Sequence, residues 1–405
     1  MTMNNTLSTY FSGIAAKRLS NVETNSSSSN QHEFNGINEL KSVFGTEKVE
    51  FSGTFIYLND NPESVITENG FLTWYDARAN HETRTEYRLY YSTNNVMSSA
   101  NEGDLLIIGR TSDNELAIII ASEGSTSEQQ IKWLFGLEEV ATKFIVKDLL
   151  SDDNELNYAG KHIVSTLGFE IQDSSPEYLD ELLEKFGHSF PTTAIFSEFA
   201  RSKAGDVSAI EEPDTTLIKW LEQEELLFKT MEKHFVSKKL SEGFGSTGVD
   251  VDEFVSYSLS IQNRRKSRAG HSFENHLASI FQANDIHFSN GKKTERNNKP
   301  DFLFPNIESY HDAEFAVELL TMLGVKTSAK DRWRQVLSEA NKIKNKHLIT
   351  LEPAISMNQT EEMREQNLQL IIPSPLHDTY TVNQQRNLID LNDFISLVKD
   401  KQLRN

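Results

Sequence analysis

The sequence predicts a two-part chain in which a mostly-β N-terminal half precedes an α/β C-terminal half. Two features of the 405-residue sequence support this prediction. Between residues 48 and 136, short runs rich in β-branched and aromatic residues are separated by Asn, Asp, Gly and Ser, a pattern typical of strands joined by tight turns. Beyond residue 216, apolar residues recur at helical spacing around a few short apolar runs, which is typical of an α/β domain.

The strands of the N-terminal half are expected where its apolar runs lie. The last two runs flank the polar residues 110–114, so they are expected to form a hairpin. Short strands at this spacing favour a small barrel or sandwich. The expected strands cover residues 49–58, 70–75, 86–91, 105–109 and 116–122.

The middle of the chain is expected to connect two domains. Residues 202–216 contain Gly205, Pro213 and several acids, which predicts an exposed connection. Helical periodicity follows over 216–240 and 251–262. We therefore predict an N-terminal domain over residues 1–170, a linker with connecting helices over 171–215 and a C-terminal domain over 216–405.

The C-terminal half is expected to form a sheet flanked by helices. Residues 271–281 predict a helix, because Phe273, Leu277 and Phe281 lie on one stripe with Glu274 at its edge. A second helix is expected to start near residue 328 and to bury the stripe that begins with Trp333. Strands are expected to begin at Asp301 and to cover residues 321–327, 348–351 and 368–372.

Composition limits the class of protein. The chain has no cysteine, which excludes disulfides and zinc–thiolate sites and suits a reducing cytosol. The first ten residues lack a cationic start followed by a long apolar run, and the aliphatic run 116–121 is far too short to span a bilayer. We therefore expect a cytoplasmic protein without membrane attachment.

Charge is distributed unevenly along this acidic chain. The formal net charge is −20, which by itself disfavours nucleic acid because binding DNA depends on cations that neutralise phosphates. Residues 262–299, however, contain eight Lys or Arg against three acids, and residues 326–346 contain seven against two. These basic segments suit DNA contacts, whereas a solvated helical face is the alternative interpretation.

Four residues form a candidate catalytic group. Asp301 opens one expected strand, and Lys326 would project beside it if the strand over 321–327 pairs with the first. Glu339 is expected on the following helix and Glu274 on the helix over 271–281. Phosphodiester cleavage requires an activated water and stabilisation of a charged transition state, and Mg²⁺ held by carboxylates supplies both.

The expected roles follow from this chemistry. Asp301 and Glu339 are the expected Mg²⁺ ligands, and Glu274 can complete the metal shell. Lys326 can orient or deprotonate the water and neutralise charge at the scissile phosphate. The alternative is that Glu274 is only a charged residue at a helix edge.

Four sequence blocks in order over residues 263–335 resemble the catalytic domain of EcoRII-type (type IIE) restriction endonucleases. They are 263–270 (NRRKSRAG), 299–305 (KPDFLFP), 310–315 (YHDAEF) and 325–335, which contains VKT and KDRWRQ. The resemblance implies a PD-(D/E)xK nuclease fold, Mg²⁺-dependent cleavage of double-stranded DNA at a short CC/GG-type site (CCWGG), a homodimer, and a cognate DNA methyltransferase in the same restriction–modification system.

The same resemblance maps functional residues. The catalytic set of the family falls on Glu274, Asp301, Lys326 and Glu339. Its base-reading segment falls on Lys330, Asp331 and Arg332, which suits DNA because Arg and Lys bind guanine O6 and N7 and Asp can accept from cytosine N4.

The N-terminal half resembles the effector domain of the same family, a DNA-binding pseudobarrel. Residues 16–20 and 83–88 are similar to its two recognition segments. The sequence departs from the family at Glu82 and Tyr87, where lysines are expected. The resemblance also implies that this domain inhibits cleavage until it binds a second copy of the site. The expected DNA contacts are Lys17, Arg18, His32, Arg84, Glu86 and Arg88. Of these, Arg84, Glu86 and Arg88 are expected to alternate along one strand, so that their side chains share one face.

Several other signals have simpler interpretations. Gly243, Gly245 and Gly248 fit a dinucleotide fingerprint but follow a helical pattern, which favours a loop. His271 and His276 lack a third ligand at helical spacing and are interpreted as surface or interface residues.

Three further alternatives stay open. Arg264 and Arg265 are either a phosphate clamp or the end of a dimer-contact helix. Trp220 is more compatible with a core position than with a group that holds an extruded base. The alternative function for the whole chain is a sequence-specific DNA-binding regulator that does not cleave.

Overall fold

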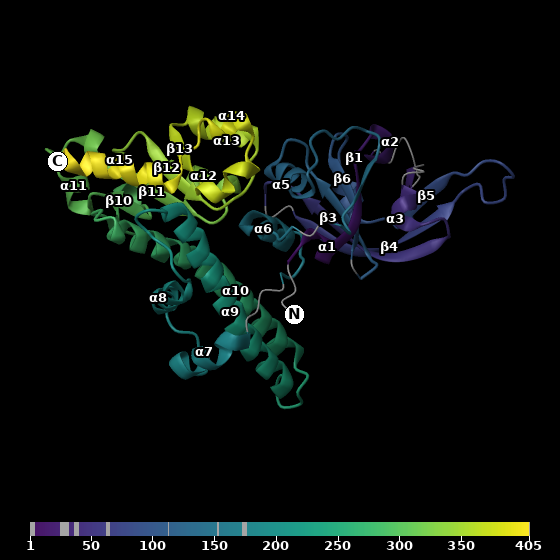
Figure 1. Cartoon of the computed structure of the whole chain (residues 1–405), viewed down its shortest axis with the longest axis horizontal. Coiled ribbons are helices and arrows are strands. Elements are labelled where there is room, and N and C mark those ends of the chain that lie inside the picture. Colours follow the sequence, from purple (N-terminus) through teal and green to yellow (C-terminus); the bar gives the residue numbers. More distant parts are fainter. Residues whose placement is uncertain are drawn as a thin grey trace. The chain divides into compact units, whose positions relative to one another are not determined.

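The computed structural model describes residues 5–24, 32–35, 40–61, 65–111, 113–151, 154–171 and 176–404. The chain divides into two compact units (Figure 1). The first unit comprises Met1–Ile171 and Ala354–Gln359, and the second comprises Gln172–Pro353 and Thr360–Asn405. The part of the predicted linker at residues 172–175 lies outside the described residues.

The first unit is built on an eight-stranded sheet in the order β2-β5-β4-β3-β7-β6-β1-β8. Neighbouring strands are antiparallel except β3 and β7, which are parallel. The predicted mostly-β character and the hairpin of β6 with β7 are confirmed. The strands are β1 (Phe11–Arg18), β2 (Glu33–Asn35), β3 (Val49–Leu58), β4 (Ile66–Asp76), β5 (Tyr87–Tyr91), β6 (Leu105–Thr111), β7 (Leu116–Ala121) and β8 (Ile145–Asp148).

Both faces of this sheet are covered by apolar side chains. Along β7, Ile118 belongs to a core cluster on one face and Ile119 to a cluster on the other. Burial on both faces explains why β6 and β7 read as unbroken apolar runs instead of alternating ones. The helices of this unit are α1 (Leu7–Tyr10), α2 (Asn21–Thr24), α3 (Lys41–Phe44), α4 (Asn95–Ser99), α5 (Thr126–Phe135) and α6 (Tyr158–Thr166).

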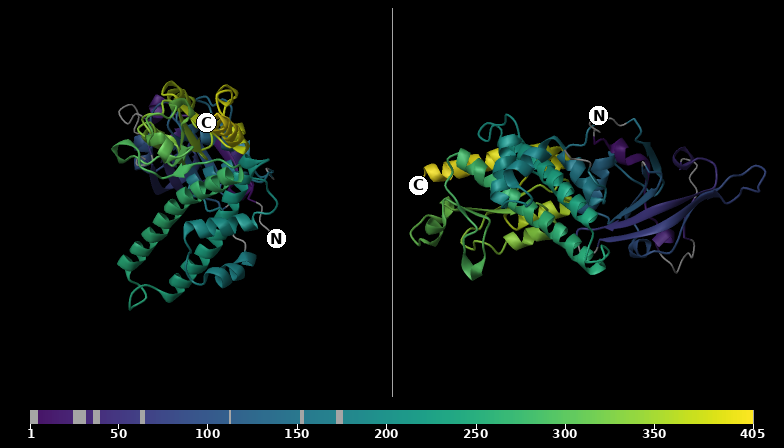
Figure 2. Two further views of the ribbon diagram at one scale, coloured as in Figure 1. Left: turned by 90° about the vertical axis from the view of Figure 1, so that its left-hand side faces the viewer. Right: turned by 90° about the horizontal axis from the view of Figure 1, so that it is seen from below.

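Two long helices dominate the second unit (Figure 2). Helix α9 (Pro213–Glu242) begins with proline in its first turn. Helix α10 (Val251–Ala283) is capped by the preceding residue, Asp250, whose side chain accepts a hydrogen bond from the Glu253 amide. The two helices predicted over 251–262 and 271–281 are therefore one helix. Gly270 lies in its interior and is tolerated there at a modest energetic cost.

The remaining helices of the second unit are short. Helices α7 (Leu179–Phe186) and α8 (Thr193–Lys203) pack their phenylalanines against α9, so much of the predicted linker is a helical core. The glycine-rich segment 243–248 is a loop between α9 and α10, as predicted. The others are α11 (Ile307–His311), α12 (Trp333–Val336), α13 (Met357–Glu365, which starts in the first unit), α14 (Val382–Gln385) and α15 (Leu391–Leu403).

The second unit contains a mixed five-stranded sheet in the order β13-β12-β11-β10-β9. Strands β9, β10 and β11 are antiparallel, whereas β11, β12 and β13 are parallel. The predicted α/β character is confirmed. The strands are β9 (Ser289–Asn290), β10 (Phe302–Phe304), β11 (Thr321–Lys326), β12 (Lys346–Thr350) and β13 (Leu368–Ile371).

The helix expected after β11 is much shorter than predicted. A 3-10 turn (Lys330–Arg332) leads into α12, which ends at Val336. The following amides of Leu337, Ser338 and Glu339 bond three residues back, and Ala340 has φ +46°. Glu339 therefore lies on a turn after the helix, and the prediction of a helical Glu339 is wrong.

No helix among the described residues is long and apolar enough to cross a membrane.

Candidate active site

The candidate site is centred on a contact between two neighbouring strands. Phe302 of β10 pairs with Leu323 of β11, which brings Asp301 opposite the end of β11. Asp301 Oδ2 lies 3.0 Å from Lys326 Nζ and accepts a hydrogen bond of 2.6 Å from the Val325 amide. The predicted proximity of Asp301 and Lys326 is confirmed.

A close helix–strand contact brings Glu339 toward this pair. Gly324 lies two residues before Lys326 and therefore on the same face of β11. A Cβ atom at Gly324 would lie 2.7 Å from Val336 Cγ2, so only glycine lets α12 approach this closely. The turn after α12 then carries Glu339 to within electrostatic range of Asp301 and Lys326.

Glu339 is a candidate ligand for a divalent cation. Burial raises the pKa of Glu339 to about 7, and the charge of Asp301 acts in the same direction, against Lys326 and Lys346. Its Oε2 atom is buried and has no hydrogen-bond partner among the described residues. A buried carboxylate oxygen of this kind is suited to a hard divalent cation such as Mg²⁺.

Glu274 lies on α10 and faces the same group of charges. Burial raises its pKa, and the charge of Asp301 adds to the effect, whereas His271, Asn290 and Lys326 oppose it. Glu274 and Glu339 therefore each interact electrostatically with Asp301 and Lys326.

The predicted shell of three carboxylate ligands is not assembled. Within the described ranges, no three Asp, Glu, His or Cys side chains are arranged to hold a metal ion. The reason is visible at Asp301, since its Oδ2 atom is already bonded to Lys326 and to the Val325 amide. The oxygen donors nevertheless fit Mg²⁺ chemically, and the unpaired Glu339 oxygen supports that fit.

The predicted base-reading segment immediately follows β11. Lys330 and Arg332 lie in the 3-10 turn, where Arg332 is exposed and Lys330 is half-buried. Trp333, which is fully buried, anchors the end of this segment in the core. The predicted residue Asp331 lies in the same turn, and the structure does not describe its side chain.

The basic run on α10 mostly binds α9. Arg265 donates to Glu232 at 2.8 Å, and Arg268 lies 3.5 Å from Glu224. Arg264 is exposed, with its guanidinium 5.1 Å from the ring centre of Phe190. Of the predicted residues Arg264 and Arg265, only Arg265 forms an ion pair with another described residue.

A buried polar network in the same helices was missed by the sequence analysis. His276 is fully buried, so its interpretation as a surface histidine is wrong. Its Nε2 atom lies 3.0 Å from Glu224 Oε2 and its Nδ1 atom 3.3 Å from Arg201. Burial lowers the pKa of His276, whereas the hydrogen bond and the charge of Glu224 oppose this shift. Trp220 is 8% exposed and packs on His276, which confirms the core interpretation.

The predicted DNA contacts of β1 are mostly engaged within the first unit. Lys17 is buried and paired with Glu23 at 2.7 Å. Arg18 pairs with Glu128 at 2.5 Å. His32 is half-buried, with Nε2 3.4 Å from Thr93 Oγ1. Lys17 would have to leave Glu23 to reach DNA, so its role as a DNA contact stays a prediction.

The second predicted recognition segment also differs from expectation. Strand β5 begins at Tyr87, so Arg84 and Glu86 precede it and the three residues do not alternate on one strand. Arg84 is exposed, whereas Arg88 pairs with Glu33 at 2.7 Å and with Glu86 at 2.6 Å. Tyr87, which stands where the resemblance predicts a lysine, is buried and donates a hydrogen bond to the Thr46 carbonyl. The tyrosine therefore contributes to the packing of this unit.

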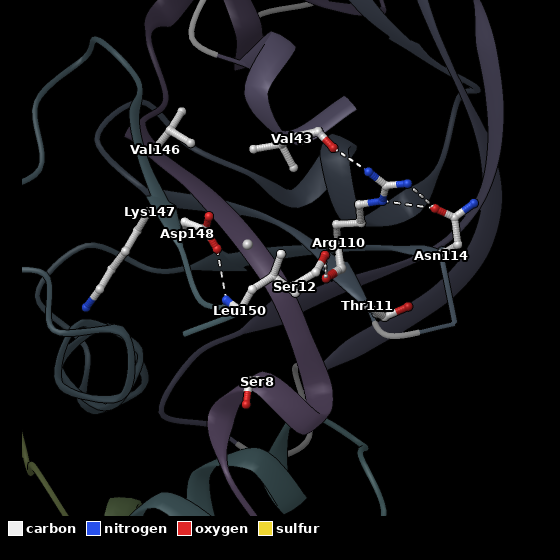
Figure 3. A pocket seen from close by; sticks show the side chains of 11 residues that line it. Ser8, Ser12, Val43, Arg110, Thr111, Asn114, Val146, Lys147, Asp148 and Leu150 are labelled. Atoms are coloured by element: carbon white, nitrogen blue, oxygen red, sulfur yellow. Dashed lines mark hydrogen bonds between the residues drawn. The ribbon is translucent and has the colours of Figure 1, made fainter. Parts of the chain in front are cut away.

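A pocket of about 420 Å³ in the first unit contains none of the predicted site residues (Figure 3). Its two cations have internal partners, because Arg110 donates to the Val43 carbonyl at 2.6 Å and Lys147 to the Phe135 carbonyl at 2.8 Å. We therefore assign no ligand to this pocket.

Comparison with known proteins finds a family that is similar to part of the second unit. Residues 228–395, which include all four candidate catalytic residues, match the family described as EcoRII C terminal. Over this segment the chain is similar to EcoRII-type restriction endonucleases, and the resemblance noted in the sequence is confirmed.

A characterised relative supports this assignment. The chain is 41% identical to the type II restriction enzyme EcoRII of Escherichia coli over 230 residues, which are 56% of this chain and 55% of that enzyme. The chain thus matches about half the length of this relative.

Two solved structures are also similar to the chain. One is metal-depleted Ecl18kI in complex with uncleaved DNA, with 18% identity, a TM-score of 0.46, and coverage of 57% of this chain and 86% of that one. The other is the complex of the restriction endonuclease PspGI with substrate DNA, with 14% identity, a TM-score of 0.45, and coverage of 53% and 95%.

Proposed function

We propose that the chain is a Mg²⁺-dependent type II site-specific deoxyribonuclease that hydrolyses phosphodiesters of double-stranded DNA and has a PD-(D/E)xK catalytic fold. One observation carries this proposal. Lys326 Nζ lies 3.0 Å from Asp301 Oδ2, and both residues interact electrostatically with Glu339, whose Oε2 atom has no hydrogen-bond partner among the described residues; all three lie in the family-matched segment. Phosphodiester hydrolysis requires a water, a cation and a phosphate to lie close together. Asp301, Lys326 and Glu339 could hold these three groups at the ends of the neighbouring strands.

The residues have distinct roles in this proposal. Asp301 and Glu339 hold Mg²⁺, and Glu274 completes the set. When bound, Mg²⁺ polarises a phosphate oxygen and makes a bound water more acidic. Lys326 orients or deprotonates the attacking water and neutralises charge that develops on the scissile phosphate.

The DNA site is proposed to be of the CC/GG type, with CCWGG as the expected sequence. Lys330 and Arg332 suit the O6 and N7 acceptors of guanine, and Asp331 suits the amino donor of cytosine. Arg264, which is exposed, is proposed as a phosphate contact or as part of the dimer interface described below.

Supercoiled plasmid incubated with the full chain and Mg²⁺ tests the proposal. Linear fragments with a common end sequence are expected, and sequencing those ends gives the recognition site. The alternative is a DNA-binding regulator without cleavage activity, which would shift the plasmid in a gel but leave it uncut. Presence of all four residues of the catalytic set favours the enzyme.

The first unit is proposed to be an effector DNA-binding pseudobarrel that inhibits cleavage until it binds a second copy of the site. Arg84 is exposed beside the Glu33–Arg88–Glu86 ion pairs, which supports a charged recognition surface. His32 and Arg18 are assigned to the same surface, and Lys17 would have to leave Glu23 to contribute.

Removal of residues 1–175 is expected to give a fragment that cleaves at least as fast as the full chain, because the inhibitory unit is lost. Cleavage rates of the two proteins on a plasmid with a single site test this expectation. Circular dichroism must show that the fragment is folded. A folded fragment that binds DNA but does not cleave would contradict autoinhibition.

A homodimer is proposed because each chain supplies one catalytic set and two strands must be cut. The exposed start of α10 offers a self-complementary surface. Val251, Val255 and Leu259 form a stripe at helical spacing and are 70%, 47% and 54% exposed. Asp252 lies at the start of this stripe and Arg264 follows its end, so antiparallel pairing of two copies would bring opposite charges toward each other.

Leu259→Asp is therefore expected to convert the dimer to a monomer at micromolar concentration, because it places a charge in an apolar contact. Sedimentation velocity measures this change. Ser260→Asp adds the same charge on the opposite side of the exposed helix and should leave the dimer intact. Equal masses for Leu259→Asp and the wild type would contradict this interface.

The proposal also implies a cellular context. A cognate DNA methyltransferase would protect the same site in a restriction–modification system, and both proteins would act in the cytoplasm.

A further inference from the structure

The turn that carries Glu339, residues 338–342, has a backbone conformation that its own sequence does not favour. Ala340 has φ +46°, a left-handed conformation that residues other than glycine adopt rarely. Such a conformation persists only where surrounding groups hold it in place. The side chains that surround this turn therefore decide where the Glu339 carboxylate lies.

Lys346 holds one side of this turn. Its side chain is buried, with the residue only 7% exposed, and its Nζ donates to the carbonyl of Glu339 and, at 3.2 Å, to the carbonyl of Ala340. Lys346 is itself fixed at the start of β12, where it pairs with Leu368 of β13 and its amide bonds to the Asn367 carbonyl. The ammonium thus connects the core of the sheet to the two carbonyls that flank the left-handed residue.

Tyr310 and Glu295 hold the other side. The fully buried Tyr310 donates its hydroxyl to Glu295 at 2.6 Å, and Glu295 accepts from the Asn341 amide at 3.3 Å. The Tyr310 hydroxyl also accepts from the Lys342 amide at 3.3 Å. Successive amides after Glu339 are therefore bonded to one side-chain pair.

We propose that Lys346 and the Tyr310–Glu295 pair are positioning residues that hold Glu339 in place for the divalent cation. This inference rests on the proposed role of Glu339 as a metal ligand. None of the three acts on the reacting atoms; each acts through the backbone of the turn. Substitution of partners that orient a metal ligand commonly costs about 10- to 100-fold in metal affinity or activity.

Lys346→Met tests the first contact, because methionine keeps the length and apolar stem of lysine but cannot donate to the carbonyls. Mn²⁺ binding to the full chain, followed by electron paramagnetic resonance, is expected to weaken by at least about 10-fold. DNA affinity without metal should be unchanged. Lys344→Met is the matched control, because Lys344 is exposed two residues earlier and should leave the Mn²⁺ midpoint at the wild-type value.

Tyr310→Phe tests the second contact and removes a single oxygen atom. The Mn²⁺ midpoint is expected to rise by a smaller factor than for Lys346→Met, because Lys346 still holds the carbonyls. This variant decides the question if Lys346→Met does not fold, as judged by circular dichroism. A wild-type Mn²⁺ midpoint in a folded Lys346→Met, or in Tyr310→Phe when Lys346→Met is unfolded, would overturn the inference.

Glu339→Gln separates this inference from the proposed function. If Glu339→Gln weakens Mn²⁺ binding while Lys346→Met and Tyr310→Phe do not, Glu339 is a ligand and the positioning role is wrong. If Glu339→Gln itself binds Mn²⁺ and cleaves DNA like the wild type, the proposed function of Glu339 fails and the positioning role fails with it.

Discussion

Lys326→Ala is expected to lower the single-turnover rate of DNA cleavage by at least about 10³-fold while leaving DNA binding unchanged. The size of the effect follows from the two proposed roles of the ammonium, since proton transfer and charge stabilisation each contribute on the order of 10²-fold or more. The fold should persist, because Asp301 keeps its 2.6 Å hydrogen bond from the Val325 amide.

The measurement combines a quenched-flow cleavage assay with a gel-shift titration on the same duplex. Lys344→Ala removes an exposed cation from the same basic segment and should cleave at the wild-type rate. A Lys326→Ala protein that cuts at the wild-type rate would show that the contact with Asp301 has no catalytic role.

Glu224→Leu is expected to destabilise the second unit by about 3–5 kcal/mol, the usual cost of removing one partner from a buried ion pair. Glu224 is fully buried beside His276 and Arg268. Burial opposes the ionisation of Glu224, but its contact with His276 and the charge of Arg268 bring its pKa below the ordinary value. Leucine would remove the partner of His276 Nε2 and leave Arg268 with Glu225 as its remaining acidic partner among the described residues.

Urea denaturation followed by far-ultraviolet circular dichroism measures this loss, since α9 and α10 supply much of the helical signal. Glu242→Leu, at the exposed end of the same helix, should change stability by no more than about 0.5 kcal/mol. Equal denaturation midpoints for Glu224→Leu and the wild type would mean that the network does not stabilise the unit.

The pairing of Asp301 with Lys326 could be predicted because it depends on strand periodicity. Side chains on a strand alternate with period two, so the face that carries Gly324 and Lys326 was evident from sequence. The antiparallel pairing of β10 with β11 then sufficed to bring Lys326 to Asp301. The long apolar runs of β6 and β7 were predictable for a similar reason, because local sequence and burial agree there.

The position of Glu339 could not be predicted from periodicity. The apolar spacing of Trp333, Val336 and Ala340 suits a helix, yet the chain leaves the helix at Val336. Lys346 donates to the turn, whereas Glu295 and the Tyr310 hydroxyl accept from its amides, and the last two residues come from distant parts of the sequence. These hydrogen bonds override the local preference for a helix.

The burial of individual polar and charged residues could not be predicted from the sequence either. Lys17 and His276 are polar residues that sequence analysis places at the surface, and both are buried beside a glutamate. Each glutamate comes from a different element, Glu23 from α2 and Glu224 from α9. Such pairs become visible only when the packing of elements is known, since charged residues are seldom fully buried without one.

The contact of Lys326 with Asp301 gives the chain an internal counter-ion at the place where Mg²⁺ is proposed to act. Chelation would remove the external cation but not this one, and the strand pairing between β10 and β11 would keep its electrostatic support. Loss of activity on chelation therefore reports on chemistry and not on unfolding, which makes the metal-free protein a sound reference state for measuring DNA affinity.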